Sequence, residues 1–512
     1  MKTENNKNRS YNQRLTITAD LQPSGYKYYI PVKHLPPSRL AGGVPTMKLK
    51  IFTALLIGAI LVATYIYSLE RNAEHSVTVR DGFFGISGIL HNKSLLDEAG
   101  VECHIYGFFI GASESFWDGG LRLNTKNILY TVKNGSTPIV TFLAGEIVDP
   151  HKTRENVRRV VEYYTEGDGF RLTGYRVIYW QIGNEENGFW RTSCSAEEYA
   201  ERVKIIAGAI REACPDCTII MGGLLPGISG DKNLSLYLKT FLECGGGEYI
   251  DVYNFHYYGF SKPVPGGDYY LSGVKIYREI KRILALYGYN KPVWVTEMST
   301  FSGKVGRIYQ SEEEQAADLV KRFVVLKAVG VEKAFWTYMV EPSYEGTGEG
   351  FFDQAGLIYD GLGPYDKGCG VRKKSYYAYK TIVHLLRDSS IVQAYNNTET
   401  YVFQFASAGQ MVTVVWHDYW HGNATVKIKP RGEVKIIDIY GNTLMESTAN
   451  LTWTLGLEPI YIVGEVEVEI GPWRISPPGG FLLACAFRIV SVRYEMLSSL
   501  ATSSKPISFI FS

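Results

Sequence analysis

The chain has 512 residues, 46% of them hydrophobic, which is enough for one large domain and a smaller one. Its 53 basic and 52 acidic residues give a net charge of +1, so the charge offers no reason to expect nucleic acid as a partner. Aromatic residues make up 13%, and such rings serve either as stacking platforms for sugars or as a large core.

The N-terminal region divides into a polar part and an apolar part. Residues 1–46 show no helical or strand period, and we predict a disordered extension or a stretch that precedes the true start at Met47. The apolar, uncharged run at 51–67 follows a charged MKLK, so we predict that 47–70 is a signal peptide or signal anchor. A buried helix is the alternative.

The predicted location is extracytoplasmic, secreted or held at the cell surface by this segment, which is the only predicted membrane contact. Six sequons after this segment are compatible with export: Asn92, Asn134, Asn233, Asn396, Asn423 and Asn450.

Seven cysteines occur, so at least one thiol is free or pairs with another chain. Cys214 and Cys217 form the motif CPDC, but no second Cys pair or His pair follows at zinc spacing. We therefore predict no metal site, and we predict no cofactor. Cys194 and Cys369 are a candidate bridge if their loops meet.

From 78 to 388, short apolar runs alternate with amphipathic helical stretches. The strand-like runs lie at 81–87, 102–109, 137–143, 175–183, 217–223, 250–258, 292–298 and 333–339. The helical stretches lie at 153–165, 196–213, 274–288, 312–330 and 374–388. Strands buried on both faces that alternate with helices are typical of a parallel sheet, and eight units predict an α/β fold, the (β/α)8 TIM barrel. An open doubly wound sheet would carry a Gly-rich turn after its first strand, and none is present.

After residue 390 the pattern changes to short strands separated by turn signals. Residues 390–475 therefore predict a small antiparallel β-sandwich domain. Residues 476–512 form a C-terminal tail to which no role is assigned; its apolar run is too short to span a bilayer.

Two predicted barrel strands end in a carboxylate. The fourth strand runs into Asn184, Glu185 and Glu186, and the seventh ends with Glu297. A carboxylate at the end of a buried strand is costly unless it is paired or functional, and the C-terminal strand ends form the active face of a barrel. A structural ion pair with Arg or Lys is the alternative for each.

Cleavage of a glycosidic bond requires two such carboxyl groups, one that protonates the leaving oxygen and one that is ionised. A separation of about 5–5.5 Å is typical of retaining enzymes and about 6.5–9.5 Å of inverting ones.

The segments YWQIGNEENG and PVWVTEMST resemble the acid/base and nucleophile strands of clan A glycoside hydrolases, most closely those of families 39 and 79. The resemblance covers about residues 80–388. It implies retention by double displacement, with Glu185 as acid/base and Glu297 as nucleophile. It also implies that Asn184 binds the sugar 2-hydroxyl, and it favours Glu185 over its neighbour Glu186.

Further positions fit the same site. The sixth strand carries His256 and Tyr258 on one side and Tyr257 on the other. The resemblance implies a substrate contact for His256, a hydrogen bond from Tyr258 to the nucleophile, and a platform under the sugar for Trp336; core packing is the alternative for each. Candidate subsite residues in loops are Trp117 and Trp190, and Glu341 is a candidate for binding hydroxyls.

Many clan A families place an Arg at the end of an early strand, close to the nucleophile. The second strand here has none, and His104 or Tyr106 is a candidate substitute.

The predicted function is thus hydrolysis of β-glycosidic bonds in poly- or oligosaccharides. Two alternatives stay open: a catalytically inactive, cell-surface carbohydrate-binding barrel, and a transglycosylase that uses the same intermediate. Sugar, linkage, exo or endo action, and oligomeric state do not follow from the sequence.

Overall fold

A computed structural model describes residues 77–88, 95–108, 116–143, 146–189, 193–264, 267–342, 348–397, 399–407, 409–418, 424–471 and 490–492. The predicted N-terminal extension and the segment 47–70 lie outside the described residues, as does the predicted tail apart from 490–492. Within the described ranges we find no helix with the length and hydropathy needed to cross a lipid bilayer.

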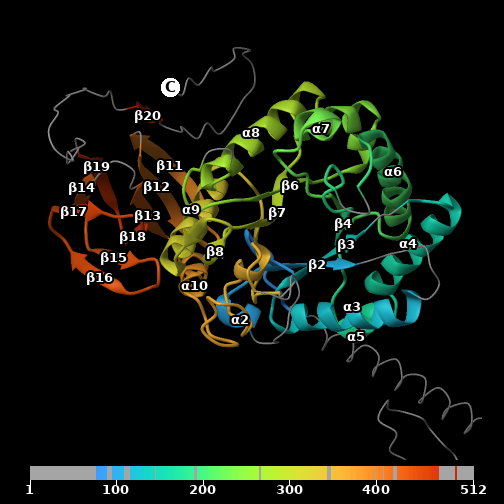
Figure 1. The fold of residues 1–512 in the computed structure, drawn as a ribbon, viewed down its shortest axis with the longest axis horizontal. Helices are drawn as coiled ribbons and strands as arrows, with labels where there is room; N and C mark the ends of the chain where they lie inside the picture. Colours follow the sequence, from blue (N-terminus) through green and yellow to red (C-terminus); the bar gives the residue numbers. More distant parts are fainter. Residues whose placement is uncertain are drawn as a thin grey trace, which may run out of the picture. The chain divides into compact units, whose positions relative to one another are not determined.

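Eight parallel strands form the predicted barrel (Figure 1). They are β1 (Phe84–Ser87), β2 (Cys103–Phe108), β3 (Thr137–Phe142), β4 (Tyr179–Ile182), β5 (Thr218–Met221), β6 (Tyr253–Tyr258), β7 (Val293–Ser299) and β10 (Ala334–Thr337). The order is β5-β4-β3-β2-β1-β10-β7-β6, and parallel bridges from Ile220 to Val252 and from Leu224 to Phe255 join the two remaining edges. The (β/α)8 barrel is therefore confirmed.

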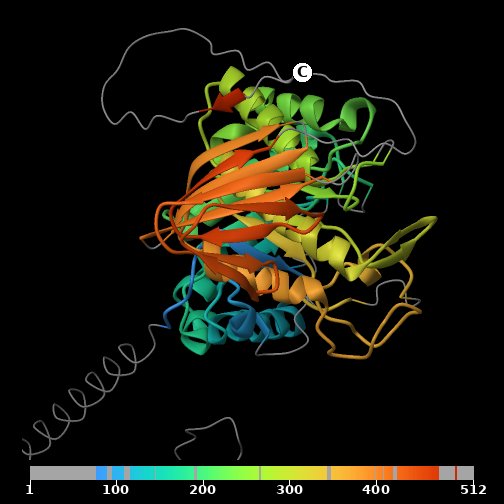
Figure 2. The ribbon, with the colours of Figure 1, turned by 90° about the vertical axis from the view of Figure 1, so that its left-hand side faces the viewer.

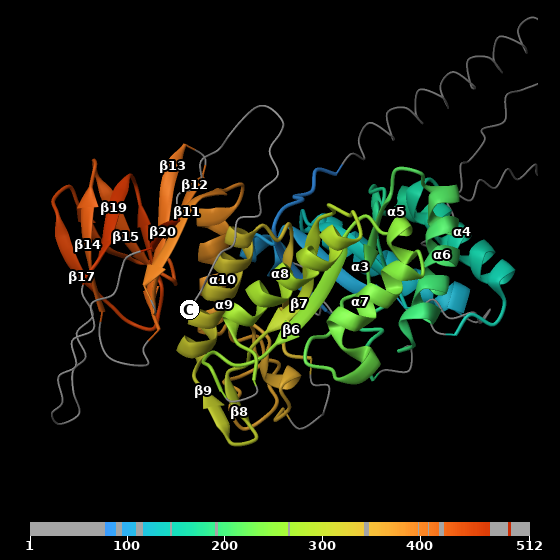
Figure 3. The same cartoon turned by 90° about the horizontal axis from the view of Figure 1, so that it is seen from above.

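Helices surround the strands (Figure 3). They are α2 (Leu95–Ala99), α3 (Phe116–Lys133), α4 (Pro150–Thr165), α5 (Asp168–Thr173), α6 (Ala196–Ala213), α7 (Leu234–Glu243), α8 (Tyr270–Leu286), α9 (Glu312–Val329) and α10 (Lys374–Leu386). Local sequence fixes several starts: Ser195 with Glu198 and Ser311 with Glu314 form capping boxes for α6 and α9. The described ranges also contain 3-10 turns at Gly230–Lys232, Gly246–Tyr249 and Phe352–Gln354, and a hairpin that joins β8 (Gly303–Val305) to β9 (Ile308–Gln310).

The C-terminal region forms two antiparallel sheets, so the predicted sandwich is confirmed (Figure 2). One sheet contains β11 (Ser390–Asn397), β12 (Thr400–Ser407), β13 (Gln410–His417), β15 (Val434–Asp438), β16 (Thr443–Ser447), β18 (Ile460–Val463) and β20 (Val490–Val492). The other contains β14 (Ala424–Pro430), β17 (Leu451–Leu455) and β19 (Val466–Ile470). Strand β20 lies within the predicted tail and pairs with β11.

The larger sheet of the sandwich has apolar residues on both faces. One face packs on the smaller sheet through a core that includes Val402, Val415 and Val426. The opposite face, with Phe405 and Trp416, belongs to the same core as the barrel helices. Buried polar contacts fasten this junction: Asp418 accepts hydrogen bonds from Tyr270 of α8 at 2.5 Å and from Lys321 of α9 at 2.8 Å.

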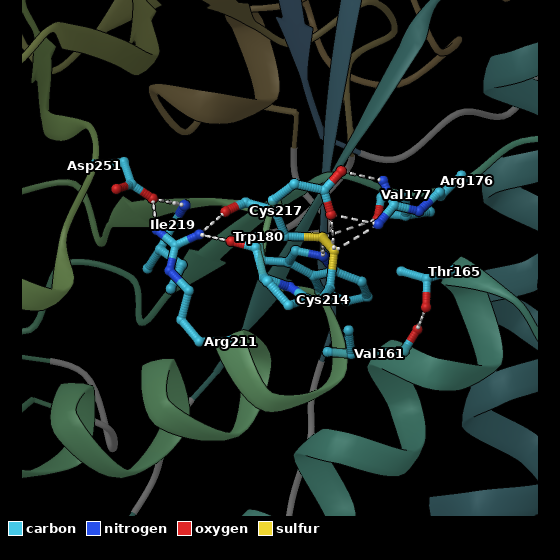
Figure 4. The surroundings of a disulfide bond; sticks show 12 residues. Val161, Thr165, Arg176, Val177, Trp180, Arg211, Cys214, Cys217, Ile219 and Asp251 are labelled. Atoms are coloured by element: carbon cyan, nitrogen blue, oxygen red, sulfur yellow. Dashed lines mark hydrogen bonds and ion pairs between the residues drawn. A yellow bond between two sulfur atoms is a disulfide. The ribbon is translucent and has the colours of Figure 1, made fainter.

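The CPDC motif forms a disulfide that joins the end of α6 to the start of β5 (Figure 4). Arg176 donates a hydrogen bond to the Sγ of Cys214 at 3.2 Å, and the indole of Trp180 donates to the Sγ of Cys217 at 3.3 Å. The candidate bridge between Cys194 and Cys369 is wrong, since both thiols are free, one buried and one exposed.

Candidate active site

The two candidate carboxylates meet at the C-terminal end of the barrel. Glu185 follows β4 and is buried, whereas the Glu297 side chain, in β7, is 23% exposed. A carboxylate oxygen of each and a ring nitrogen of His256 all lie within 4.8 Å of one another. Residues far apart in the sequence thus form one cluster of three titratable groups.

An irregularity in β7 aims Glu297 into the barrel. In the pairing with β6, Asn254 lies opposite Trp294, but His256 lies opposite Glu297, so β7 uses one extra residue. Trp294 faces the lumen and Val295 faces the helices. Strict alternation would turn Glu297 outward with Val295, and the bulge reverses that direction.

The backbone after β4 separates Glu185 from its neighbour. Glu185 has a φ of 56°, a left-handed conformation that costs a non-glycine residue about 1–2 kcal/mol, and its N–H donates to the carbonyl of Gly223 at 3.1 Å. The fully buried Glu186 points away, accepting from the N–H of Asn184 at 3.2 Å and lying 3.7 Å from Arg202. Burial raises the pKa of Glu186 to about 7. The structure therefore brings Glu185, not Glu186, to Glu297.

His256 bridges the site from β6. Its Nδ1 lies 2.8 Å from the Oε1 of Glu185 and 4.0 Å from the Oε2 of Glu297, and its Nε2 lies 2.9 Å from the hydroxyl of Thr296. Burial by itself lowers the pKa of His256, but the charges of Glu297 and Glu185 raise it above the ordinary value. A Cβ on Gly223 would lie 2.0 Å from Nε2, so the imidazole requires glycine at that position.

Tyr258 donates a hydrogen bond to the Oε2 of Glu297. Burial and the charge of Glu297 hold the pKa of the phenol well above 10, so the hydroxyl remains a donor. Burial and the charge of Glu185 raise the pKa of Glu297, while His256 and the Tyr258 hydrogen bond lower it; the net direction is upward. The hydrogen bond to one oxygen thus orients Glu297, whose side chain remains partly exposed.

Aromatic rings from the loop after β10 pack around Tyr258. The ring centroids of Phe351 and Phe352 lie 5.9 and 5.0 Å from that of Tyr258, both nearly perpendicular to it. Tyr338 packs on Phe352 at 6.3 Å. This loop therefore supplies an apolar wall beside Glu297.

The structure corrects the predicted role of Trp336. Its side chain is fully buried in the core shared with the helices, and its indole donates to the carbonyl of Ala355 at 3.0 Å. Alternation along β10 explains this, because Phe335 faces the lumen and Trp336 therefore faces outward. Core packing, the alternative, accounts for this residue.

The structure does not support the predicted substrate contact of His256. The side chain is fully buried, and both ring nitrogens lie within hydrogen-bonding distance of protein atoms. Its partners are Glu185 and Thr296, so the described structure directs neither ring nitrogen toward a substrate hydroxyl.

The other predicted residues have different outcomes. Glu341 is buried in an ion pair with Lys373 and is not presented for hydroxyls. His104 is fully engaged with Thr131 and the carbonyl of Gly88, so it does not replace the missing Arg. Asn184 is half-buried directly before Glu185. The remaining predictions lie outside the described residues or side chains: Tyr106, Trp117 and Trp190.

Three site residues did not feature in the sequence prediction: Gln181 of β4, Asn254 of β6 and Thr296 of β7. They are buried and hydrogen-bonded to one another directly beneath the carboxylates. A polar residue within an apolar strand is the sequence signal that could have identified them. Asn254, for example, lies on the same face of β6 as His256 and Tyr258.

Among the described residues, two acidic clusters come close enough to contact a single metal ion: Glu185 with His256 and Glu297, and Glu341 with Asp360 and Asp366. Hydrogen bonds organise the first cluster, and the ion pair of Glu341 with Lys373 organises the second. We assign neither to a metal.

A cavity of about 600 Å³ opens at the opposite, N-terminal end of the barrel. It is lined by Asp81, Tyr179, Trp294 and Lys333, among others. Lys333 is paired with Asp81, which also accepts from Tyr179 at 2.7 Å, so these polar groups satisfy one another. In TIM barrels this end contributes to stability, and the cavity is not part of the carboxylate site.

Solved structures similar to this fold include glycoside hydrolases. A family 39 glycoside hydrolase from the gut symbiont Bacteroides cellulosilyticus WH2 matches with a TM-score of 0.59 at 18% identity, over 75% of this chain and 81% of that chain. A glucosidase from Croceicoccus marinus matches with a TM-score of 0.57 at 12% identity, over 76% and 97%. A GH30 endoxylanase from Clostridium papyrosolvens C71 matches with a TM-score of 0.51 at 13% identity, over 76% and 97%.

No protein-family model matches the sequence, and neither does any curated protein. At these identities the likeness to solved structures is one of fold, and at that level the predicted resemblance to clan A glycoside hydrolases is confirmed.

Proposed function

We propose that the chain is a retaining glycoside hydrolase that cleaves β-glycosidic bonds of oligo- or polysaccharides by double displacement. One observation carries the proposal: carboxylate oxygens of Glu185 and Glu297 approach within 4.8 Å. That approach is compatible with the spacing of about 5–5.5 Å in retaining enzymes and is shorter than the roughly 6.5–9.5 Å typical of inverting ones.

In the first step, Glu297 attacks the anomeric carbon while Glu185 gives its proton to the glycosidic oxygen. The bond from C1 to that oxygen breaks, the leaving sugar departs as an alcohol, and a glycosyl ester forms on Glu297. In the second step, Glu185 takes a proton from water, the resulting hydroxide equivalent attacks C1, and the ester bond breaks. Two inversions at C1 give net retention.

Neighbouring groups support this division of labour. Tyr258 donates to the Oε2 of Glu297 and so holds the carboxylate in one orientation. His256 holds Glu185 from the other side of the site. We assign Asn184, which precedes Glu185, to the sugar 2-hydroxyl, where a hydrogen bond strengthens in the transition state.

We also propose an extracytoplasmic location. The charged and then apolar segment at 47–70 has the layout of an export signal, and the Cys214–Cys217 disulfide is of a kind that persists in oxidising compartments. Cell fractionation with an antibody against the folded domain tests this, and recovery in the reducing cytosol would contradict it.

A panel of aryl α- and β-glycosides tests the enzyme proposal. We expect hydrolysis of at least one β-glycoside, and a fall of about 100-fold or more in Glu185→Gln when the leaving group is poor. Glu186→Gln is the matched control, because it changes the adjacent carboxylate outside the cluster. Sugar binding without turnover would favour the inactive binding barrel, and transfer to an added sugar acceptor in preference to water would favour the transglycosylase.

A further inference from the structure

We propose that Thr296, oriented by Asn254 and Gln181, is a positioning residue that fixes His256 with its proton on Nε2, so that Nδ1 and the Oε1 of Glu185 share one proton. The role of that proton in acid/base chemistry rests on the proposed function. The protonation pattern itself follows from counting donors and acceptors in a closed, buried network.

Two backbone groups determine which way the amides point. The N–H of Thr296, which can only donate, lies 3.0 Å from the Oδ1 of Asn254. The carbonyl of Gly183, which can only accept, lies 3.1 Å from the Nε2 of Gln181. The Nδ2 of Asn254 and the Oε1 of Gln181 are therefore the atoms that face Thr296, and neither amide can be turned over without opposing like groups.

The hydroxyl of Thr296 has one hydrogen and two lone pairs. It accepts from the Nδ2 of Asn254 at 2.6 Å and donates to the Oε1 of Gln181 at 3.1 Å. Its remaining lone pair faces the Nε2 of His256 at 2.9 Å, and that contact is a hydrogen bond only if Nε2 carries the hydrogen. The second Nδ2 hydrogen of Asn254 reaches Gln181 at 3.0 Å, which completes the network.

This arrangement leaves one hydrogen for the contact between Nδ1 and Glu185, which lie 2.8 Å apart. Either Glu185 holds it as a carboxylic acid and donates to Nδ1, or Nδ1 holds it and donates to the carboxylate. The charged or titratable groups that act on His256 are Glu185 and Glu297, and Tyr258 bonds to Glu297. The Oε2 of Glu297 lies 4.0 Å from Nδ1, which is too far for a hydrogen bond. Nδ1 therefore shares this hydrogen with Glu185 and not with Glu297.

Nitrogen NMR of the full chain, labelled with ¹⁵N in its histidine rings, tests the pattern without substrate. The His256 signals are assigned by their loss in His256→Gln. We expect Nε2 to remain protonated across the pH range in which the protein is folded, and Nδ1 to be the nitrogen that loses its hydrogen as the pH rises. An Nε2 that loses its hydrogen first, with Nδ1 still protonated, would overturn the proposal, whether or not the protein hydrolyses glycosides.

Kinetics of three variants provide a second, independent test. In Thr296→Val we expect kcat to fall about tenfold, as for loss of one hydrogen bond to a charged group, with little change in KM and with an altered alkaline limb of the kcat profile. Thr296→Ser, which retains the hydroxyl, is expected to restore kcat and the profile.

The matched control is Thr337→Val in β10. Its hydroxyl is also fully buried but has no hydrogen-bond partner in the described structure, so its loss should leave both the rate and the profile unchanged. Equal effects of Thr296→Val and Thr296→Ser, or a Thr296→Val profile that matches wild type, would contradict the positioning role.

Discussion

Different kinds of side chain fill the two parts of the barrel lumen. Apolar side chains fill the lower part, toward the N-terminal ends of the strands, and polar side chains fill the upper part, toward their C-terminal ends. The lower part is an apolar cluster formed by Cys103, Ile105, Ile139, Ile220, Val252, Trp294 and Phe335. The upper part is polar and holds Gln181, Glu185, Asn254, His256, Thr296 and Glu297. Apolar layers tolerate approximate packing, whereas a buried polar layer is stable only if each group finds its partner. The comparison therefore assigns stability to the lower lumen and chemistry to the upper lumen.

The largest expected effect comes from Glu297→Gln. The amide is nearly isosteric but cannot attack the anomeric carbon, so kcat on an activated aryl β-glycoside should fall by on the order of 10⁴-fold or more. Thermal unfolding monitored by circular dichroism should show a native fold. Activity within tenfold of wild type would contradict the role of Glu297 as nucleophile in the upper lumen.

Phe335→Ala is the counterpart in the lower lumen. Phe335 is fully buried, and truncation of such a ring costs about 3–5 kcal/mol in the free energy of unfolding. We expect that loss in urea denaturation, together with a kcat/KM close to that of wild type in the absence of denaturant. A large loss of kcat/KM at unchanged stability would show that the two layers are not separable.

Gly223→Ala perturbs the upper layer without removing any polar group. The added methyl would lie 2.0 Å from the Nε2 of His256, so the ring must move and take its contact with Glu185 with it. A displacement of this kind costs about 100-fold in kcat/KM. The control is Gly432→Ala, where a Cβ meets nothing within 4 Å, and equal activity of the two variants would contradict the account.

The smallest expected effect is a change in pH dependence. Burial raises the pKa of Glu297, and this carboxyl must be ionised to attack, so kcat/KM should fall as the pH decreases through a value above the ordinary range for Glu. In Tyr258→Phe the hydrogen bond that lowers this pKa is lost. The acid limb should then move to higher pH, with a fall of about tenfold at the optimum. An acid limb that stays in place or moves to lower pH would contradict the role of Tyr258.

Hydrophobic runs predicted the eight strands and the carboxylates at two of their ends, because strand burial and strand termini are local properties. Side-chain direction was harder to predict. A bulge in β7, set by pairing with β6, turns Glu297 inward where simple alternation would turn it outward. The direction of the Trp336 side chain likewise depends on which face of β10 points into the lumen. Phe335 faces the lumen, so alternation turns Trp336 toward the helices.

The hydrogen-bond network beneath the carboxylates lay beyond the sequence for a different reason. Gln181, Asn254 and Thr296 come from three strands, and each alone is an unremarkable polar residue in an apolar run. Only the closed ring brings them within hydrogen-bonding distance.

The anomeric configuration of the first product, followed by proton NMR during hydrolysis of an aryl β-glycoside, tests the central claim most directly. With the carboxylate oxygens of Glu185 and Glu297 within 4.8 Å, the account predicts that the β-anomer appears first and mutarotates later. Initial appearance of the α-anomer would mean single displacement and would contradict the pairing of Glu185 as acid/base with Glu297 as nucleophile.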